Sequence, residues 1–383
     1  MATTRRPGPG PRRQPAAVRP GIAARPGIAG RRGRRIGGPL WTKIAIAAGL
    51  ALALVAGGLA YDVHADGAGT AAPPPGRKLS GAVDILLLGL DYRVRLGEED
   101  THADTIIILH VPAGHDEAYL IPLERDLLVQ LPPWPTSGYL GGQAKLTETF
   151  FHGVRDGAGW ASGAKFMAQT VSRITGLQFD GLAVIDFRGF KNIVDALGSV
   201  RLCIDQETYS RHMIFVDGEP QWPGHGVKMR GHKTRIRYEK GCQDLPGWAA
   251  LDYSRERYSL TNGNYDRQRH QMQLLKAIAH KATSAGVITD PARVRRVVEA
   301  AGRSFILDTN GRPLDDFIFT MKEIAAADLV MVKINGGEFR SLTIGKTSYR
   351  FLDEPSKRML DAVAGDELGS FLLANPQFLV PAS

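Results

Sequence analysis

An uncharged apolar run occupies residues 44–60, between Trp41 on one side and Tyr61 on the other. As an α-helix, the segment from Trp41 to Tyr61 is long enough to cross the roughly 30 Å hydrocarbon layer of a membrane, and aromatic residues are typical of both membrane interfaces. We therefore predict one transmembrane helix over residues 41–61. A cleaved signal peptide is the alternative, because residues 63–65 resemble a small-residue cleavage site. Under either interpretation the rest of the chain is exported.

The segment before this run is strongly basic. Residues 1–43 contain ten Arg and Lys43 but no acidic residue, a charge of +11, whereas residues 44–383 hold 37 basic and 39 acidic residues, a charge of −2. The tail is rich in Pro and Gly and poor in large apolar residues, so residues 1–40 are predicted to be disordered. Positive charge marks the cytoplasmic end of a membrane helix. Nucleic-acid binding is the alternative, but the tail has no interleaved aromatic residues, and we expect no nucleic-acid partner.

Residues 62–79 contain small residues, three consecutive prolines and no periodic pattern, which predicts a stalk. Residues 80–383 are then one large domain outside the cell, attached to the cell membrane by a single span. The only cysteines, Cys203 and Cys242, lie in this domain, and an oxidising compartment favours a disulfide between them. Two buried free thiols are the alternative. The lack of a C-x-x-C or His-rich pattern argues against a zinc site.

Strand and helix patterns alternate through the exported domain. Short apolar runs predict strands at residues 83–90, 105–111, 118–122, 182–187 and 200–204. The second and third of these strands are expected to form a hairpin through residues 112–117. Helical patterns occur at 159–175, 190–197, 265–284 and 290–301. Residues 206–246 are a long, polar, Gly-rich excursion. Strands interleaved with helices predict an α/β sandwich around a mixed sheet.

Charged residues lie next to several of these strands. Asp91 and Arg93 follow the first predicted strand, Asp104 directly precedes the second, and Arg125 follows the third. Ligands of α/β sheets collect at strand ends, and Arg binds phosphate through paired hydrogen bonds. Two carboxylates beside several guanidinium groups can hold a divalent cation together with a diphosphate. For each residue alone, a solvated surface charge, a turn or a helix cap is the alternative.

Seven segments occur in an order that resembles a known family. They are VDILLLGLDYR, ADTIIILHV, an Arg-Asp pair after the next strand, KLTETF, FDGLAVIDFRGFKNIVDALGSV, AALDYSRERY and NYDRQRHQ. Together they resemble the LytR–CpsA–Psr (LCP) family of cell-wall proteins over essentially all of residues 80–383. The Ala-, Gly- and Arg-rich composition suits an actinobacterial member. The resemblance implies an α-β-α sandwich with a central mixed sheet, preceded by one membrane anchor.

The resemblance also implies an activity. Family members look like Mg²⁺- or Mn²⁺-dependent phosphotransferases on the outer face of the membrane. They move a glycopolymer from a polyprenyl-pyrophosphate carrier to a peptidoglycan hydroxyl and form a phosphodiester. The implied partners are therefore the lipid-linked glycopolymer, peptidoglycan and the membrane. A pyrophosphatase acting on the same carrier and a membrane-bound transcriptional regulator are the alternatives that the sequence leaves open.

Carried over residue by residue, the resemblance assigns roles to charged side chains. Asp91 and Asp104 match acidic positions tied to Mg²⁺ binding or acceptor activation, and with Arg125 they form the implied catalytic group. Lys145 matches the basic residue of a K-I-N-like segment, and Gln271 matches the last residue of an R-Q-Q-like run. The arginines implied to bind pyrophosphate are Arg93, Arg125, Arg255, Arg257, and either Arg267 or Arg269.

Four segments depart from the family pattern. Glu124 replaces the proline of a P-R-D motif, which puts a negative charge beside Arg125 and is expected to weaken pyrophosphate binding. The other three departures read Lys145-Leu146-Thr147 for K-I-N, Gly198-Ser199-Val200 for G-G-V and Arg269-His270-Gln271 for R-Q-Q. The family also has an apolar pocket for the polyprenyl chain. Its candidate lining residues, with ordinary core packing as the alternative, are Phe166, Phe187, Phe190 and Val194.

Overall fold

The computed structural model describes residues 77–380, with gaps at 93–96, 223–229, 259, 286, 288–290, 314–315, 318–319, 321–328 and 339. The predicted tail, transmembrane helix and most of the predicted stalk lie outside the described residues. No helix in the described part of the chain is both long and apolar enough to cross a membrane. Residues 77–79 already contact the domain, since the backbone N–H of Leu79 donates to Thr320 Oγ1 at 2.8 Å.

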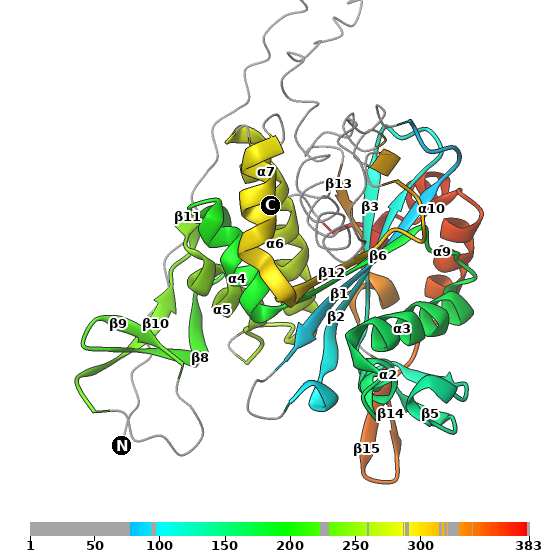
Figure 1. Cartoon of the computed structure of the whole chain (residues 1–383), viewed down its shortest axis with the longest axis horizontal. Coiled ribbons are helices and arrows are strands. Elements are labelled where there is room, and N and C mark those ends of the chain that lie inside the picture. Colours follow the sequence, from blue (N-terminus) through cyan, green and yellow to red (C-terminus); the bar gives the residue numbers. More distant parts are fainter. Residues whose placement is uncertain are drawn as a thin grey trace, which may run out of the picture. The chain divides into compact units, whose positions relative to one another are not determined.

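A six-stranded mixed sheet, in the order β12-β6-β1-β2-β3-β13, forms the centre of the domain (Figure 1). Antiparallel pairs join β1 (Val83–Asp91) to β2 (His102–Val111), and β2 to β3 (Ala118–Leu123). Parallel pairs join β1 to β6 (Gly181–Asp186), and β3 to β13 (Leu329–Met331). The edge strand β12 (Phe305–Asp308) is antiparallel to β6. The predicted mixed sheet is confirmed.

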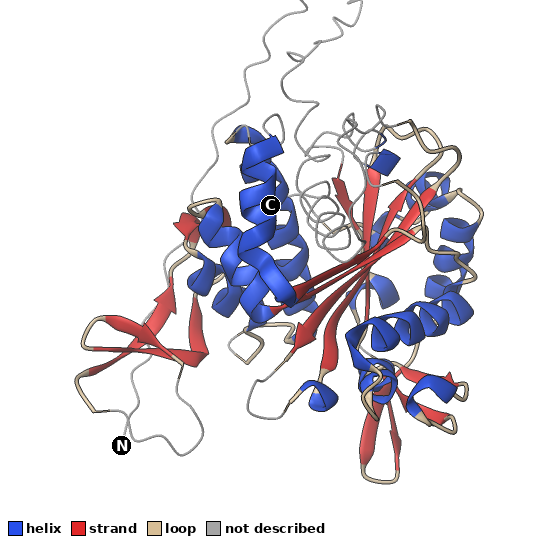
Figure 2. Ribbon diagram, in the orientation of Figure 1, coloured by secondary structure: helices blue, strands red, loops and turns tan. Residues whose placement is uncertain are grey.

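Helices cover both faces of this sheet (Figures 1 and 2). In β1, Ile85 packs into the core on one face and Leu86 into the core on the other. A strand buried on both faces has a continuous apolar sequence, as β1 does, because successive side chains point to opposite faces. The predicted α-β-α sandwich is therefore confirmed. The first face is covered by α4 (Phe187–Ala196), α5 (Gly247–Arg255), α6 (Asn264–Ser284) and α7 (Pro291–Ala301), and the second by α2 (Leu146–Val154), α3 (Gly159–Thr175), α9 (Glu354–Ala364) and α10 (Leu368–Ala374).

The described residues of the predicted excursion, 206–222 and 230–246, include strands that the sequence analysis did not identify. In β10, Ile236 and Tyr238 are buried while Arg235 and Arg237, which alternate with them, are exposed, and a charged segment can therefore form a strand. Cys203 and Cys242 lie opposite each other on β7 and β11 and are joined by a disulfide. The strands are β7 (Val200–Ile204), β8 (Thr208–Val216), β9 (Glu219–Gln221), β10 (Lys233–Tyr238) and β11 (Gly241–Leu245).

Two short hairpins complete the strand list. β4 (Leu128–Leu131) pairs with β5 (Gly142–Lys145), which sets the start of α2 beside the loop that follows β3. The backbone N–H of Thr147 donates to the carbonyl of Arg125 at 2.8 Å and fixes this contact. The other hairpin is β14 (Ser341–Ile344) with β15 (Thr347–Arg350), and the short 3-10 turns are η2 (Glu98–Asp100), η3 (Pro135–Ser137), η4 (Gly302–Ser304), η6 (Ile334–Gly337) and η7 (Pro376–Phe378).

Candidate active site

Asp91 and Asp104 lie at adjacent ends of β1 and β2. Asp91 pairs with His102, but the register shifts between the pairs formed by Gly89 and Leu90, so Asp104 is the extra residue of a β-bulge. Bulges redirect side chains and are common beside active sites. Both carboxylates line one polar pocket together with Arg125 and Lys145. The structure thus brings four of the predicted site residues into one place.

The loop after β3 supplies the cationic side of this polar pocket. Arg125 Nη1 donates to Asp104 Oδ1 at 2.6 Å, and Lys145 Nζ donates to Asp126 Oδ1 at 2.8 Å. Burial lowers the pKa of the Arg125 guanidinium, but the charges of Asp104 and Asp126 outweigh burial and raise it overall. Burial raises the pKa of Asp126, while Lys145 and Arg125 together hold it below its usual range. Arg125 and Asp126 are therefore both charged at neutral pH.

Helix α6 adds a second arginine to this group. The Arg267 side chain is only 5% exposed, and it interacts electrostatically with Asp104, Arg125 and Arg257. Burial lowers the pKa of this guanidinium, and the negative charge of Asp104 opposes that effect. A buried cation beside the polar pocket can interact with an anion far more strongly than a solvated one can.

A second set of charges surrounds His212 on β8. Burial, followed by the positive charges of Arg255 and Arg257, lowers the pKa of His212 to about 4, while Asp91 acts in the opposite direction. Arg257 acts on both His212 and Arg267 and so connects this set to the polar pocket. Residues far apart in sequence are thus linked electrostatically: Arg257 acts on Arg267 beside Asp104 and Arg125, and on His212 beside Arg255 and Asp91.

An apolar pocket adjoins the polar one on the same two strands. Gly89 lies two positions before Asp91, Thr105 directly follows Asp104, and both line the apolar pocket. A Cβ atom at Gly89 would approach Thr105 Cβ to 2.9 Å, so a larger residue would not fit here without a shift. Along β1 and β2, the linings of the two pockets are therefore separated by only one or two residues.

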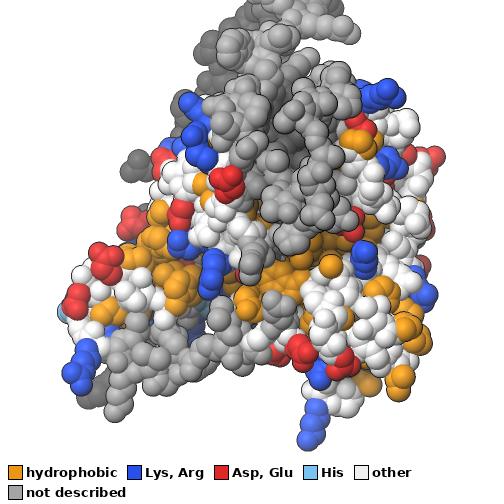
Figure 3. Space-filling model, viewed as in Figure 1, with side chains coloured by type: hydrophobic (Ala, Val, Ile, Leu, Met, Phe, Trp, Pro, Cys, Tyr) orange, Lys and Arg blue, Asp and Glu red, His pale blue; other side chains and the backbone are white. Residues whose placement is uncertain are grey.

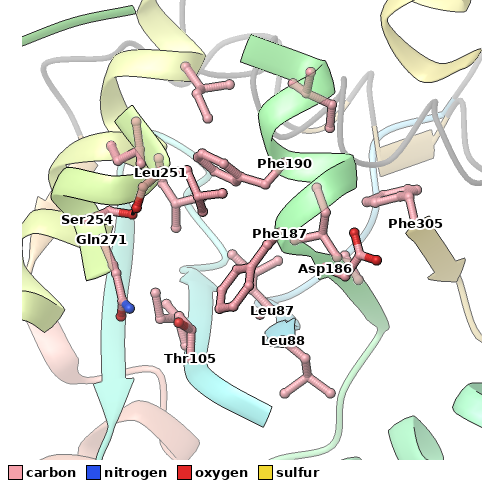
Figure 4. A pocket seen from close by; sticks show the side chains of 18 of the residues that line it. Leu87, Leu88, Thr105, Asp186, Phe187, Phe190, Leu251, Ser254, Gln271 and Phe305 are labelled. Carbon is pink, nitrogen blue, oxygen red and sulfur yellow. Dashed lines mark hydrogen bonds between the residues drawn. The ribbon is translucent and has the colours of Figure 1, made fainter. Parts of the chain in front are cut away.

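The walls of the apolar pocket come from the central sheet and from the helices that cover its first face. Figure 4 shows Phe187 and Phe190 of α4 projecting into the space, with Gln271 of α6 and Thr105 of the sheet across from them. The guanidinium of Arg255 lies 3.9 Å from the centroid of the Phe187 ring. Figure 3 shows apolar side chains gathered across the middle of the molecular surface in view. Further lining residues are Leu87, Ile107, Leu251, Leu274, Ile278 and Phe305.

Of the two alternative arginines on α6, the structure places Arg267 beside the polar pocket and Arg269 away from it. Arg269 forms ion pairs with Asp205 and with Asp266, the latter at 3.1 Å. Residues two positions apart on a helix point in nearly opposite directions, since each residue turns by about 100°. Of the two alternatives, Arg267 is therefore the one whose charge interacts with Asp104 and Arg125.

Two candidates for the apolar pocket belong to ordinary cores instead. Phe166 lies in the core on the opposite face of the sheet, stacked on Trp134 with ring centroids 4.7 Å apart. Val194 is fully buried on the inner side of α4 and does not line the pocket. Phe187 and Phe190 line it as predicted. Arg93 lies outside the described residues.

The polar pocket also contains side chains that the sequence had not suggested. Asp100, His102 and Glu148 line it, and His212 lies near Asp91. Asp100 and His102 precede Asp104 closely, so the alternation of polar residues entering β2 was a usable signal. Glu148 accepts a hydrogen bond from the backbone N–H of Lys145 at 2.8 Å, which is the N3 contact of a capping box.

The pocket has carboxylates but no complete protein cage for a metal ion. Among the residues that the structure describes, no group of three or more His, Cys, Asp or Glu side chains could hold a metal by itself. Mg²⁺ in phosphoryl-transfer sites usually takes one or two carboxylates and completes its coordination with substrate phosphates and water. Asp91 and Asp104, in one pocket, fit that mode.

Comparison with known proteins identifies the family. A profile of the LytR_cpsA_psr family matches residues 64–362, most of the chain. The chain belongs to the LytR–CpsA–Psr family. One LCP relative is the cell wall biosynthesis protein LcpA of Corynebacterium glutamicum, which is 26% identical over 285 residues, covering 68% of this chain and 51% of the relative. The predicted family, in its actinobacterial type, is confirmed.

A second LCP relative is known both by sequence and by structure. The polyisoprenyl-teichoic acid–peptidoglycan teichoic acid transferase TagV of Bacillus subtilis is 22% identical over 228 residues, covering 60% of this chain and 49% of the relative. Its crystal structure matches with a TM-score of 0.54 at 18% identity, covering 76% of this chain and 98% of that one. The chain spans about half the length of the curated relatives it matches, and the structural likeness shows the shared LCP fold.

Proposed function

We propose that this protein transfers a glycopolymer from a polyprenyl-pyrophosphate carrier to a hydroxyl group of peptidoglycan, forming a phosphodiester during cell-wall assembly. The observation that carries the proposal is that a polar and an apolar pocket are lined by neighbouring residues of β1 and β2. One pocket suits a diphosphate and the other suits a lipid tail. The names of the relatives, a cell wall biosynthesis protein and a teichoic acid transferase, support the same class of reaction.

The polar pocket supports the diphosphate half of the proposal. The exported domain has no net positive charge to attract a polyanion, so binding depends on a local cluster of arginines. Arg125 and Arg267 provide partly and fully buried guanidinium groups there, and Arg257 lies close enough to affect Arg267. Phosphoryl transfer needs chiefly positioning and neutralisation of charge on the transferred group.

The apolar pocket supports the lipid half. Its lining is almost entirely aliphatic and aromatic, apart from Thr105, Asp186, Ser254, Arg255 and Gln271. A polyprenyl chain buried there would leave its diphosphate at the ends of β1 and β2, next to Asp91 and Asp104. Burial of apolar surface contributes about 25 cal/mol per Å², so a long lipid tail would provide most of the affinity for the carrier.

In the proposed reaction, an acceptor hydroxyl attacks the phosphorus that carries the glycopolymer. The new P–O bond forms as the anhydride P–O bond breaks, and polyprenyl phosphate leaves. One of the two carboxylates, Asp91 or Asp104, accepts the hydroxyl proton. Arg125 and Arg267 bind the phosphate oxygens, and Lys145 holds Asp126 beside Arg125. Mg²⁺ or Mn²⁺ bound by Asp91 and Asp104 would neutralise diphosphate charge.

The location follows from the same proposal. A carrier lipid is held in a membrane, so the domain must act at the membrane surface, outside the cell, with the predicted helix at residues 41–61 as its single anchor and the N-terminus in the cytoplasm. The partners are the lipid-linked glycopolymer, peptidoglycan and the membrane.

Lipid retained during purification tests the proposal. The full-length chain, purified in mild detergent, should yield a polyprenyl-pyrophosphate glycan by mass spectrometry of its extract. Arg125→Ala should retain much less of that lipid. The matched control Arg201→Ala, which alters an exposed ion pair on β7, should retain as much as the unaltered chain. Recovery of bulk phospholipid alone, equal in all three proteins, would contradict the proposal.

A further inference from the structure

Glu124, the residue that replaces the proline of the family motif, is almost fully buried. Its side chain is 1% exposed, directly after β3 and before Arg125. Neither carboxylate oxygen has a hydrogen-bond partner among the described residues. Buried polar groups are nearly always paired, so an unpaired carboxyl requires an explanation.

Among charged groups, Arg267 has the largest electrostatic effect on Glu124. The Arg267 Nε atom is also buried, without a hydrogen-bond partner among the described residues. Each group acts on the other electrostatically, and neither is hydrogen-bonded to the other. The remaining charged groups that face Glu124 are Arg125 and Asp126 on its own segment and Arg350 on β15. Glu124 and Arg267 are thus two buried residues of opposite charge beside the polar pocket, with no hydrogen bond between them.

The protonated and the ionised forms of Glu124 affect Arg267 differently. A neutral carboxyl tolerates burial and leaves the charge of Arg267 available to an anion. An ionised carboxylate attracts Arg267 and adds a negative charge beside Arg125. Burial, opposed by the charge of Arg267, raises the pKa of Glu124 to about 7, so both states are accessible near neutral pH.

We propose that Glu124 is a positioning residue that couples diphosphate binding to a proton. In its protonated form it leaves Arg125 and Arg267 to the donor, and in its ionised form it competes with the donor for Arg267. The ligand class is a diphosphate esterified at both ends, and the inference rests on the proposed function. Under this proposal, the weaker binding expected from Glu124 arises only when its carboxyl is ionised.

The sign of the coupling follows from charge. A bound diphosphate is anionic and disfavours ionisation of Glu124, so binding takes up a proton. Donor affinity therefore falls as the pH rises through 7. One linked proton changes an affinity by at most about tenfold per pH unit, so we expect Kd to rise about tenfold between pH 6.5 and 8.5. A diphosphate esterified at both ends has no ionisation of its own in this range.

One nearby group has the same titration range and must be separated from Glu124. Burial raises the pKa of Glu256 to about 7 as well. Glu256 accepts a hydrogen bond from the backbone N–H of Arg211 at 2.7 Å and belongs to the charges around His212. His212 itself, with a pKa of about 4, does not change charge in this range. Glu256→Gln is therefore the matched control for Glu124→Gln.

The test is calorimetric binding of a short-chain polyprenyl diphosphate linked to one N-acetylhexosamine, with the full-length chain in detergent. The unaltered chain and Glu256→Gln should show the rise in Kd and proton uptake, the latter measured in buffers of different ionisation enthalpy. Glu124→Gln should bind with nearly the same Kd at both pH values. Should Glu124→Gln fail to fold, proton uptake by Glu256→Gln still decides, because that variant lacks the competing carboxyl.

The outcomes separate the two proposals. A Kd independent of pH in the unaltered chain, or a pH dependence that disappears in Glu256→Gln instead, overturns the role of Glu124 and leaves the proposed function standing. No binding of this donor by the unaltered chain at any pH would count against both.

Discussion

Replacing Glu124 with Gln should make the protein more stable at alkaline pH and change its stability little at acid pH. Burial, opposed by Arg267, raises the pKa of Glu124 from 4.5 to about 7 in the folded state. Because the folded state disfavours the ionised form, the unaltered chain loses stability as the pH rises from 4.5 to about 7, and the loss persists above that. One pKa unit equals about 1.4 kcal/mol, so the full loss is about 3 kcal/mol.

Urea unfolding of the full-length chain in detergent, followed by tryptophan fluorescence at several pH values between 4 and 9, measures this effect. The Gln side chain cannot ionise, so the stability difference between Glu124→Gln and the unaltered chain should grow towards high pH by up to about 3 kcal/mol. The Glu256→Gln variant should behave similarly, since burial raises that pKa to about 7 too. A difference for Glu124→Gln that is constant with pH, or that reverses at high pH, would refute the reasoning.

Three further predictions test the site and the fold. Arg125→Ala should lower kcat/KM about 30- to 1,000-fold, the effect of losing about 2–4 kcal/mol of preorganised charge stabilisation. Arg201→Ala removes a residue of an exposed ion pair with Asp244 and should leave kcat/KM unchanged. Equal activity of the two variants would contradict the assignment of Arg125 to the site. Arg267→Ala should weaken donor binding. Arg269→Ala should lower thermal stability and leave donor binding intact, because Arg269 forms ion pairs with Asp205 and Asp266. The reverse result would mean that Arg269, and not Arg267, binds the donor. Thiol labelling of the denatured, unreduced protein should detect no free thiol. Reducing the disulfide that joins Cys203 and Cys242 across a separation of 39 residues should lower the free energy of unfolding by about 3–4 kcal/mol. Two labelled thiols would exclude the disulfide.

Local patterns predicted the central fold well. The helix at residues 159–175 was predicted with the bounds it has, since its apolar period ends at Gly176, which takes the left-handed conformation of a C-cap. The strands of the excursion were missed because pairing, not composition, creates them. In β10, charged residues alternate with Ile236 and Tyr238. The strand pairs with β8, and Tyr238 on its buried side packs against Tyr253 of α5.

The site was predictable as a set of residue types and less so as a geometry. Asp91, Asp104, Arg125 and Lys145 could be chosen from strand ends and motifs, but their convergence depends on the bulge at Asp104 and on long-range pairing. Choosing between the two arginines of α6 required the rotation of that helix against the sheet, which packing determines. His212 was missed because it lies on β8, where the sequence suggested no strand at all.

A reconstituted transfer reaction tests the central claim most directly. The full-length chain in detergent would receive a labelled polyprenyl-pyrophosphate glycan, Mg²⁺ and a peptidoglycan fragment, and both products would be quantified. We predict equal amounts of polyprenyl phosphate and of peptidoglycan that carries the glycan through a phosphodiester, with little of either in Arg125→Ala. Donor cleavage at the same rate without peptidoglycan, with no phosphodiester formed, would contradict transfer and identify the protein as a pyrophosphatase.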